Sequence, residues 1–340
     1  MKKKKVIFSI VLIMLILVIG VIFFWYKQIS SSTAFFNGDK KIVEIYQTDI
    51  PSIAQQLLHD SIISNEDDFI AFANLKSMKQ VSPGRFEVSK SETLNSIINK
   101  LKSGLQSPKR IRIEGVRSID ELSGLLGKEL FHDSSAFSEA FYDANILKDN
   151  RIDEYQISSL IFPNTYEFYW TVRPEQLFSK LRTYTEEYWT AEKKERAKNI
   201  GLSPTEVYIL ASIVKGETVD RTEAETIAGL YMNRIHDGMK LQADPTLTFE
   251  SYSGNKERVR LTDASKTSRY NTYEFAGLPP GPIYFTEPFY LDAVLNYKKH
   301  NYIYMCAKPG GKSHNFTSSD SQHLANAAAY HRWLNASQIN

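Results

Sequence analysis

Cysteine and an excess of either charge are what this chain of 340 residues most lacks. Cys306 is the single cysteine, which excludes an intrachain disulfide and any cysteine-cluster metal site. Lys and Arg number 41 against 39 Asp and Glu, so the charge balance indicates no nucleic-acid partner. The seven histidines form no HExxH pair, and a phosphate loop ending at residues 310–313 would need a glycine where Cys306 stands. We therefore expect neither a metal nor another cofactor.

One long apolar run is present, at the N-terminus. Residues 6–26 are apolar except for Ser9 and Gly20, and four lysines precede them at positions 2–5. This length and these flanks predict a single-pass membrane span over 6–26 with residues 1–5 in the cytoplasm and the rest of the chain outside. A cleaved signal peptide is the alternative interpretation.

Residues 27–39 are predicted to be a tether, and a repeating pattern follows them from residue 40 to about 130. Each copy is a short strand followed by an amphipathic helix, and one extra helix is expected near residues 68–75. The strands are expected at 41–46, 84–88 and 109–113, and the helices at 53–58, 91–101 and 119–130. This pattern predicts a small α+β region.

Residues 131–340 are predicted to form a second, mixed helical and β domain. We expect a helix at 135–144, a single helix over 174–198, a strand at 302–307 and a terminal helix from Asp320 to about Leu334. Thr222 and Glu225 have the spacing of a capping box, and Asp244 before Pro245 is typical of a turn. The aromatics between residues 160 and 169 are assigned mostly to packing.

The most informative helix is expected to begin at Ser203 and to end at Glu217. Ser203, Pro204 and Glu206 are an N-cap, a first-turn proline and a capping-box glutamate. Glu217 falls on the same face as the apolar residues of the helix, so it continues the buried stripe. A carboxyl group among aliphatic side chains has a raised pKa and can act as a general acid near neutral pH. A solvated or salt-bridged helix end remains the alternative interpretation of Glu217.

Several ordered motifs resemble the endolytic transglycosylases of the MltG or YceG-like family, which are membrane-anchored enzymes that cleave bacterial murein. The resemblance is loose up to about residue 155 and specific after it. It is carried by Phe162–Tyr166 (FPNTY), Leu210–Thr218 (LASIVKGET), Asn233-Arg234, Gly238–Thr246 (GMKLQADPT), Tyr270–Tyr273 (YNTY) and Gly277–Ile283 (GLPPGPI). In this family the N-terminal repeats correspond to a LysM-like, glycan-binding subdomain.

The chain departs from the family pattern at two places. The family usually has LASIVEKET, so Lys215 and Gly216 replace its first Glu and its Lys, while Glu217 matches its second Glu. It usually has FPDTY, so Asn164 replaces an aspartate. The first departure leaves Glu217 as the one carboxylate of this segment that can be the catalytic acid.

The resemblance implies cleavage of the β-1,4 bond between N-acetylmuramic acid and N-acetylglucosamine without water. Glu217 protonates the leaving oxygen and then takes the proton of the muramoyl 6-hydroxyl as the 1,6-anhydro ring closes. This reaction would terminate the elongation of nascent glycan strands. The residues expected to bind the substrate are Asn233, Gln242, Asp244, Tyr270, Asn271 and Tyr273.

Two other functions stay open from the sequence. A muramidase-type hydrolase would use Asp244 as the second carboxylate, and a non-catalytic peptidoglycan-binding protein is conceivable because Lys215 and Gly216 alter the motif. The resemblance also implies an inner-membrane location and partners among the penicillin-binding proteins. Peptidoglycan glycan strands are the expected substrate or ligand in all three functions.

Overall fold

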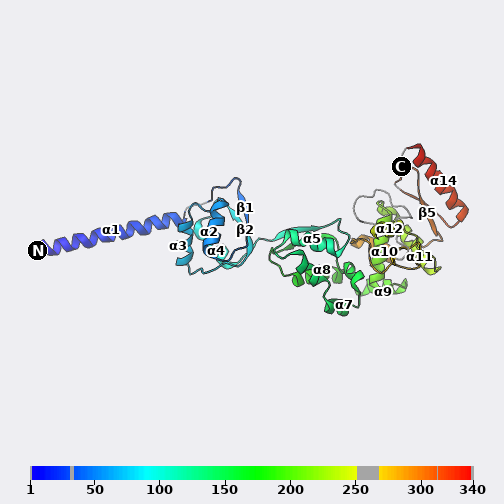
Figure 1. Cartoon of the computed structure of the whole chain (residues 1–340), viewed down its shortest axis with the longest axis horizontal. Coiled ribbons are helices and arrows are strands. Elements are labelled where there is room, and N and C mark those ends of the chain that lie inside the picture. Colours follow the sequence, from blue (N-terminus) through cyan, green and yellow to red (C-terminus); the bar gives the residue numbers. More distant parts are fainter. Residues whose placement is uncertain (1, 31–33, 251–267, 312, 338–340) are drawn as a thin grey trace. The chain divides into compact units, whose positions relative to one another are not determined.

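The computed structural model describes residues 2–30, 34–250, 268–311 and 313–337 (Figure 1). The chain folds into two compact units, of which the first comprises Met1–Arg110 and Glu167–Val172 and the second comprises Ile111–Tyr166 and Arg173–Asn340. The division falls near residue 110, whereas the third strand-and-helix repeat of the sequence ends near residue 130. Three residues of the expected tether, 31–33, lie outside the described residues.

The N-terminal helix α1 runs from Lys2 to Ser30, and its large apolar side chains between Ile7 and Phe23 are exposed. Within the described part of the chain, no helix meets the length and apolarity that a membrane span requires. The span expected over residues 6–26 stays a prediction.

The rest of the first unit is a small α+β fold, as the repeats predicted. Strand β1 (Lys40–Ile45) pairs antiparallel with β2 (Gly84–Ser89), and Val43 lies opposite Phe86 in this register. The helices are α2 (Ile50–His59), α3 (Glu66–Leu75) and α4 (Leu94–Ser103). Asp49, Asn65 and Thr93 each cap the following helix with a side-chain oxygen, so local sequence sets where these helices begin.

The second unit is mostly helical, and the strands that begin or end in it pair only in twos among the described residues. Strand β3 (Lys109–Ile113) pairs with β4 (Asn164–Phe168), and β5 (Tyr304–Ala307) pairs antiparallel with β6 (His314–Thr317). The helices are α5 (Ile119–Glu129), α6 (Ser134–Phe141), α7 (Ala144–Asn150), η1 (Glu154–Leu160), α8 (Pro174–Tyr188), α9 (Ala191–Asn199), α10 (Pro204–Glu217), η2 (Arg221–Glu223), α11 (Ala224–His236), α12 (Asp244–Glu250), α13 (Pro288–Leu295) and α14 (Asp320–Ala336).

Helix α10 is the centre of this unit. Every residue from Val207 to Val214 is buried, so the helix is covered on all sides rather than on the single stripe that the sequence predicted. It packs with α11 and α13, whose Leu230 and Leu291 belong to the same core. Each buried aliphatic side chain contributes about 1.5–3 kcal/mol, which fixes the end of α10 firmly in the fold.

Two polar side chains of α10 hold the proline-rich segment 277–286 against it. The hydroxyl of Ser212 accepts a hydrogen bond from the backbone N–H of Ile283 at 3.0 Å. The hydroxyl of Tyr208 donates to the carbonyl of Ile161 and accepts from the N–H of Thr286. Because both hydroxyls are buried, losing either contact would leave a polar group unsatisfied at a cost of about 1–3 kcal/mol.

Three local predictions were wrong. Residues 174–198 form two helices, because Thr190 begins a new one by accepting a hydrogen bond from the N–H of Lys193. The capping box expected at Thr222 and Glu225 is absent, because Asp220 caps η2 with its side chain and α11 begins without a side-chain cap. Asp244 and Pro245 begin helix α12 instead of a turn, and proline suits that first turn because its missing N–H is not needed there.

Candidate active site

Helix α10 begins and ends as its sequence predicted. The hydroxyl of Ser203 accepts from the N–H of Glu206 at 3.2 Å, and the carboxylate of Glu206 accepts from the N–H of Ser203 at 2.7 Å. Both halves of the capping box are therefore present, and they fix the first turn. Thirteen residues after Pro204, Glu217 closes the last turn with Thr218 as the C-cap.

Glu217 lies in a cleft of about 490 Å³ in the second unit. One wall comes from α10, α11, α12 and the segments beside α12, and the other comes from the β5–β6 hairpin and α14, which lie together in Figure 1. The first wall is lined by Glu217, Leu230, Tyr231, Arg234, Gln242, Asp244 and Tyr273. The second wall is lined by Met305, Cys306, Ala307, His314, His323, Tyr330 and His331.

The surroundings of Glu217 make its carboxyl group hard to ionise. Burial raises the pKa of Glu217 to about 7, and the negative charge of Asp244 acts in the same direction. A hydrogen bond from the hydroxyl of Tyr231 to Oε1 at 2.5 Å and the positive charge of Arg234 lower that pKa. These opposing effects leave a carboxyl group that can both hold and release a proton near neutral pH.

Tyr231 and Arg234 are themselves held firmly in the fold. Burial and the neighbouring carboxylate raise the pKa of Tyr231 well above its usual range, so its hydroxyl stays protonated and donates to Glu217. Arg234 is 7% exposed and donates hydrogen bonds to the carbonyls of Ile303 and Leu241 at 2.7 and 2.6 Å. Its charged group therefore links α11 to both walls of the cleft.

Asp244, Tyr273 and Gln242 meet at the same cleft. The hydroxyl of Tyr273 donates to Oδ1 of Asp244 at 2.5 Å. Gln242 has a φ of 49°, a left-handed conformation that costs a residue with a side chain about 1 kcal/mol, and its N–H donates to the carbonyl of Thr272. The 241–246 and 271–273 segments are thus tied together beside Glu217, with the side chains of all three residues on the cleft.

Three of the expected substrate-binding residues do not line this cleft. The side-chain amide of Asn233 donates to the carbonyls of His300 and Tyr302. Tyr270 packs against the rings of Tyr155 and Phe249, and Oδ1 of Asn271 accepts from the backbone N–H of Tyr273. Their contacts shape the segments around the cleft rather than its surface.

The altered positions Lys215 and Gly216 also have structural explanations. Lys215 does not line the cleft, and its Nζ lies 2.9 Å from Oε2 of Glu287 and donates to the carbonyl of Phe285. At Gly216 an added Cβ would lie 2.6 Å from Cβ of Pro245. Glycine therefore allows α12, which begins with Asp244, to approach the end of α10 closely.

Sequence reasoning missed the second wall of the cleft. His314, His323, His331 and Tyr330 come from the C-terminal hairpin and helix, about a hundred residues after Glu217. The sequence contained one signal for this wall, which is the helical spacing of α14. Tyr330 is seven residues after His323, so the two side chains share one face of the helix.

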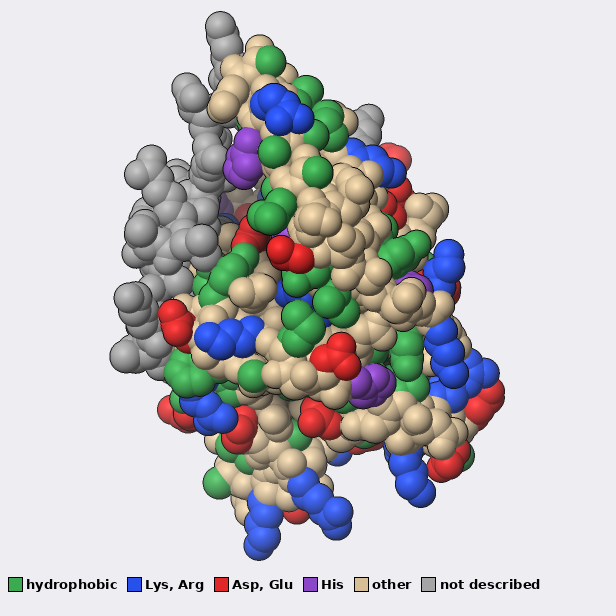
Figure 2. Space-filling view, turned by 90° about the vertical axis from the view of Figure 1, so that its right-hand side faces the viewer, with side chains coloured by type: hydrophobic (Ala, Val, Ile, Leu, Met, Phe, Trp, Pro, Cys, Tyr) green, Lys and Arg blue, Asp and Glu red, His purple; other side chains and the backbone are tan. Residues whose placement is uncertain are grey.

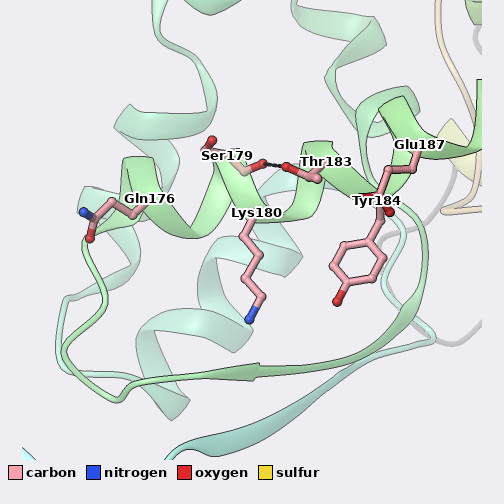
Figure 3. Close-up of a pocket in the computed structure, with 6 residues that line it drawn as sticks. All are labelled: Gln176, Ser179, Lys180, Thr183, Tyr184 and Glu187. Atoms are coloured by element: carbon pink, nitrogen blue, oxygen red, sulfur yellow. Dashed lines mark hydrogen bonds between the residues drawn. The ribbon is translucent and has the colours of Figure 1, made fainter.

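A second hollow, of about 530 Å³, lies along α8 (Figure 3). Its labelled residues all come from this one helix, and the hydroxyl of Thr183 donates to the carbonyl of Ser179 at 3.0 Å. The carboxylate here, Glu187, is exposed. On the face seen in Figure 2, acidic and basic side chains are interspersed without a large patch of one sign. The cleft at Glu217 is therefore the better candidate for catalysis.

Comparison with known proteins agrees with the motifs. The model of the YceG-like family matches residues 43–329. The chain is 25% identical over 279 residues to the endolytic murein transglycosylase of Bacillus subtilis strain 168, with 77% of each chain covered. It is 22% identical over 298 residues to the protein of the same name from Streptococcus pneumoniae strain D39, with 77% of this chain but only 53% of that relative covered.

A solved structure shares the fold. The crystal structure of a yceG-like protein from Listeria monocytogenes superposes with a TM-score of 0.56 at 23% identity. The match covers 84% of this chain and 98% of that one.

Proposed function

Because the chain belongs to the YceG-like family, we propose that it is a lytic transglycosylase that cleaves the glycan strands of peptidoglycan, with Glu217 as the catalytic acid and base. The observation that carries the proposal is a carboxyl group with a pKa of about 7 at the end of a buried helix, in an open cleft lined by polar side chains. The relatives named endolytic murein transglycosylase support the same reaction.

In the proposed mechanism one carboxyl group performs both proton transfers. Protonated Glu217 donates to the glycosidic oxygen between N-acetylmuramic acid and N-acetylglucosamine as the bond breaks, which leaves an oxocarbenium-like centre. Ionised Glu217 then accepts the proton of the muramoyl 6-hydroxyl, whose oxygen closes the 1,6-anhydro ring. No water is consumed, and Glu217 returns to its starting state.

The neighbours of Glu217 suit both halves of this cycle. Burial and Asp244 favour the protonated form that begins the reaction, whereas the hydroxyl of Tyr231 and the charge of Arg234 stabilise the ionised form produced by the first step. We propose that Gln242, Asp244 and Tyr273, which lie on the cleft, hydrogen-bond the sugar residues.

The mass of the products tests this function. Purified full-length chain incubated with peptidoglycan glycan strands is expected to release chains with 1,6-anhydromuramic acid ends, which are lighter by one water than hydrolysis products. Products with free reducing ends would instead establish a muramidase. That second function is favoured by one observation, the presence of Asp244 as another carboxylate on the same cleft.

The rate of cleavage is expected to fall as the pH rises through about 7. Only protonated Glu217 can begin the reaction, and its pKa in the fold is about 7. Tyr231→Phe removes the hydrogen bond that lowers this pKa, so the alkaline limb of kcat/KM should move to higher pH. Steady-state measurements of kcat/KM between pH 5 and 9 give this curve for the unaltered chain and for Tyr231→Phe. Identical alkaline limbs in the two proteins would contradict the assignment of Glu217 as the titrating acid.

We also propose that residues 6–26 anchor the chain in the inner membrane, with residues 1–5 in the cytoplasm and the remainder outside. The lysines at positions 2–5 and the exposed apolar side chains of α1 support this location. Recovery of the full chain in the membrane fraction, and of a chain without residues 1–33 in the soluble fraction, tests it. Recovery of both in the soluble fraction would refute the anchor.

Residues 40–130 are proposed to bind glycan strands as a LysM-like region, and residues 131–340 to form the catalytic domain. Partnership with penicillin-binding proteins is proposed from the family resemblance alone. Co-purification of a synthase with the cross-linked full chain tests it, and a chain that captures none would count against it.

A further inference from the structure

His314, on strand β6, lies on the wall of the cleft and is held there by a carboxylate from another element. Its Nδ1 is 2.8 Å from Oε2 of Glu223, and its backbone N–H donates to Oε1 of the same residue at 2.9 Å. The side chains of His314 and Glu223 are only 16% and 12% exposed. The imidazole ring therefore has a fixed position and a fixed orientation.

This contact decides which nitrogen of His314 can meet a ligand. In a neutral ring whose Nδ1–H donates to the carboxylate, Nε2 is a hydrogen-bond acceptor. Among the described residues, no protein group is bonded to that Nε2. A ring that lines a cleft and keeps one oriented acceptor is equipped to bind a donor group there.

His300 shows what a purely structural histidine looks like in the same unit. Its Nδ1 accepts from the N–H of Tyr302, and its Nε2 lies 2.9 Å from the carbonyl of Thr226. Both ring nitrogens are thus used by the backbone, and His300 does not line the cleft. His314 differs from it in both respects.

The position of Glu223 connects this histidine to the candidate acid. Glu223 ends η2, six residues after Glu217, whereas His314 is 91 residues further along the chain. Their bond joins the segment that follows α10 to the C-terminal hairpin. His314 is therefore held on the cleft by a residue of the segment that follows Glu217.

We propose that His314 is a substrate-binding residue of this cleft, whose Nε2 accepts a hydrogen bond from an O–H or N–H group of the bound glycan, and that Glu223 is the positioning residue that fixes the ring. This inference rests on the proposed function, because it takes the glycan strand as the ligand. It assigns the C-terminal hairpin to substrate recognition.

Two substitutions separate this role from a structural one. His314→Asn keeps an amide where Nδ1 stands and can still contact Glu223, but it has no atom at Nε2. Glu223→Gln keeps the size of the side chain, but its amide N–H₂ can donate to Nδ1, which moves the ring proton to Nε2 and turns the acceptor into a donor. If the Glu223–His314 pair were only structural, neither substitution would change the affinity for the substrate.

Each substitution is expected to raise KM for soluble, peptide-free peptidoglycan glycan chains about tenfold while kcat changes by less than about twofold, which is the effect of one hydrogen bond. His300→Asn is the control and should lower the melting temperature without raising KM. Unchanged KM in both His314→Asn and Glu223→Gln would overturn the inference.

Binding separates failure of this inference from failure of the proposed function. The same glycan chains are titrated by calorimetry into Glu217→Gln and into Glu217→Gln with His314→Asn, since binding needs no cleavage. About tenfold weaker binding by the double variant supports the role of His314, and equal binding refutes it. Cleavage by the unaltered chain, or its absence, tests the proposed function independently.

Discussion

Glu217→Gln is expected to lower the rate of glycan cleavage about 10³-fold, because glutamine cannot donate a proton to the leaving oxygen or accept one from the 6-hydroxyl. The fold should be preserved, since the amide oxygen can still accept the hydrogen bond from Tyr231. The measurement is the initial rate of release of soluble fragments from peptidoglycan, with kcat and KM determined for soluble glycan chains. Equal rates for the two proteins would refute Glu217 as the catalytic acid.

The stability of the same variant gives an independent check on the environment of Glu217. The pKa of Glu217 is about 7 in the fold against 4.5 for an ordinary Glu, so the folded chain binds more protons than the unfolded chain between these pH values. The free energy of unfolding therefore falls as the pH rises from about 4.5 to about 7.

In Glu217→Gln the side chain does not titrate, so the free energy of unfolding should not show this decrease between about pH 4.5 and 7. At pH 8 the free energy of unfolding of the variant is expected to exceed that of the unaltered chain by up to about 3 kcal/mol. Solvent in the open cleft screens the charge and reduces this difference. At pH 4 the two free energies of unfolding should be equal. Thermal unfolding at the two pH values measures it. A variant that is less stable at pH 8 would contradict the burial of an ionised carboxylate at this position.

Gly216→Ala is expected to cost about 10²-fold in activity, although the substituted side chain carries no chemistry. Its Cβ would lie 2.6 Å from Cβ of Pro245 and 2.9 Å from Cε2 of Tyr284, so Pro245 must move. Asp244 precedes Pro245 and accepts a hydrogen bond from the hydroxyl of Tyr273. The displacement of Pro245 therefore moves two side chains that lie on the cleft, Asp244 and Tyr273. A shift of about 1 Å in an active site can reduce the rate by this factor.

The same substitution should also destabilise the fold by about 1–3 kcal/mol through overpacking, which exceeds the gain of about 1 kcal/mol from alanine in a helix. Gly124→Ala in α5 is the matched control, because an added Cβ there meets no atom within 4 Å. That control should be slightly more stable and fully active. If Gly216→Ala behaved like Gly124→Ala, the close approach of α12 to α10 would not matter for function.

Local sequence was sufficient for elements whose limits are set by neighbouring residues. The capping box of Ser203 and Glu206 is made by contacts over three positions, and the structure contains it. The strands β1 and β2 were located from their own residue patterns, and the structure contains both. Local reasoning was wrong where two local signals competed. Asp220 caps η2 where a cap at Thr222 was expected, and Thr190 begins a second helix within the segment expected to be one helix.

The sequence by itself also determined the family, because motifs over residues 162–283 are ordered and closely spaced, and it singled out Glu217, because that residue continues an apolar face. Only the tertiary structure decided which polar residues share the cleft with Glu217. It brought Gln242, Asp244 and Tyr273 there, used Asn233 to hold the backbone at residues 300–302, and added His314 through Glu223. Helical phase and capping act over three or four residues, whereas the Glu223–His314 contact joins groups 91 positions apart, and only the packing of the whole unit fixes such a distance.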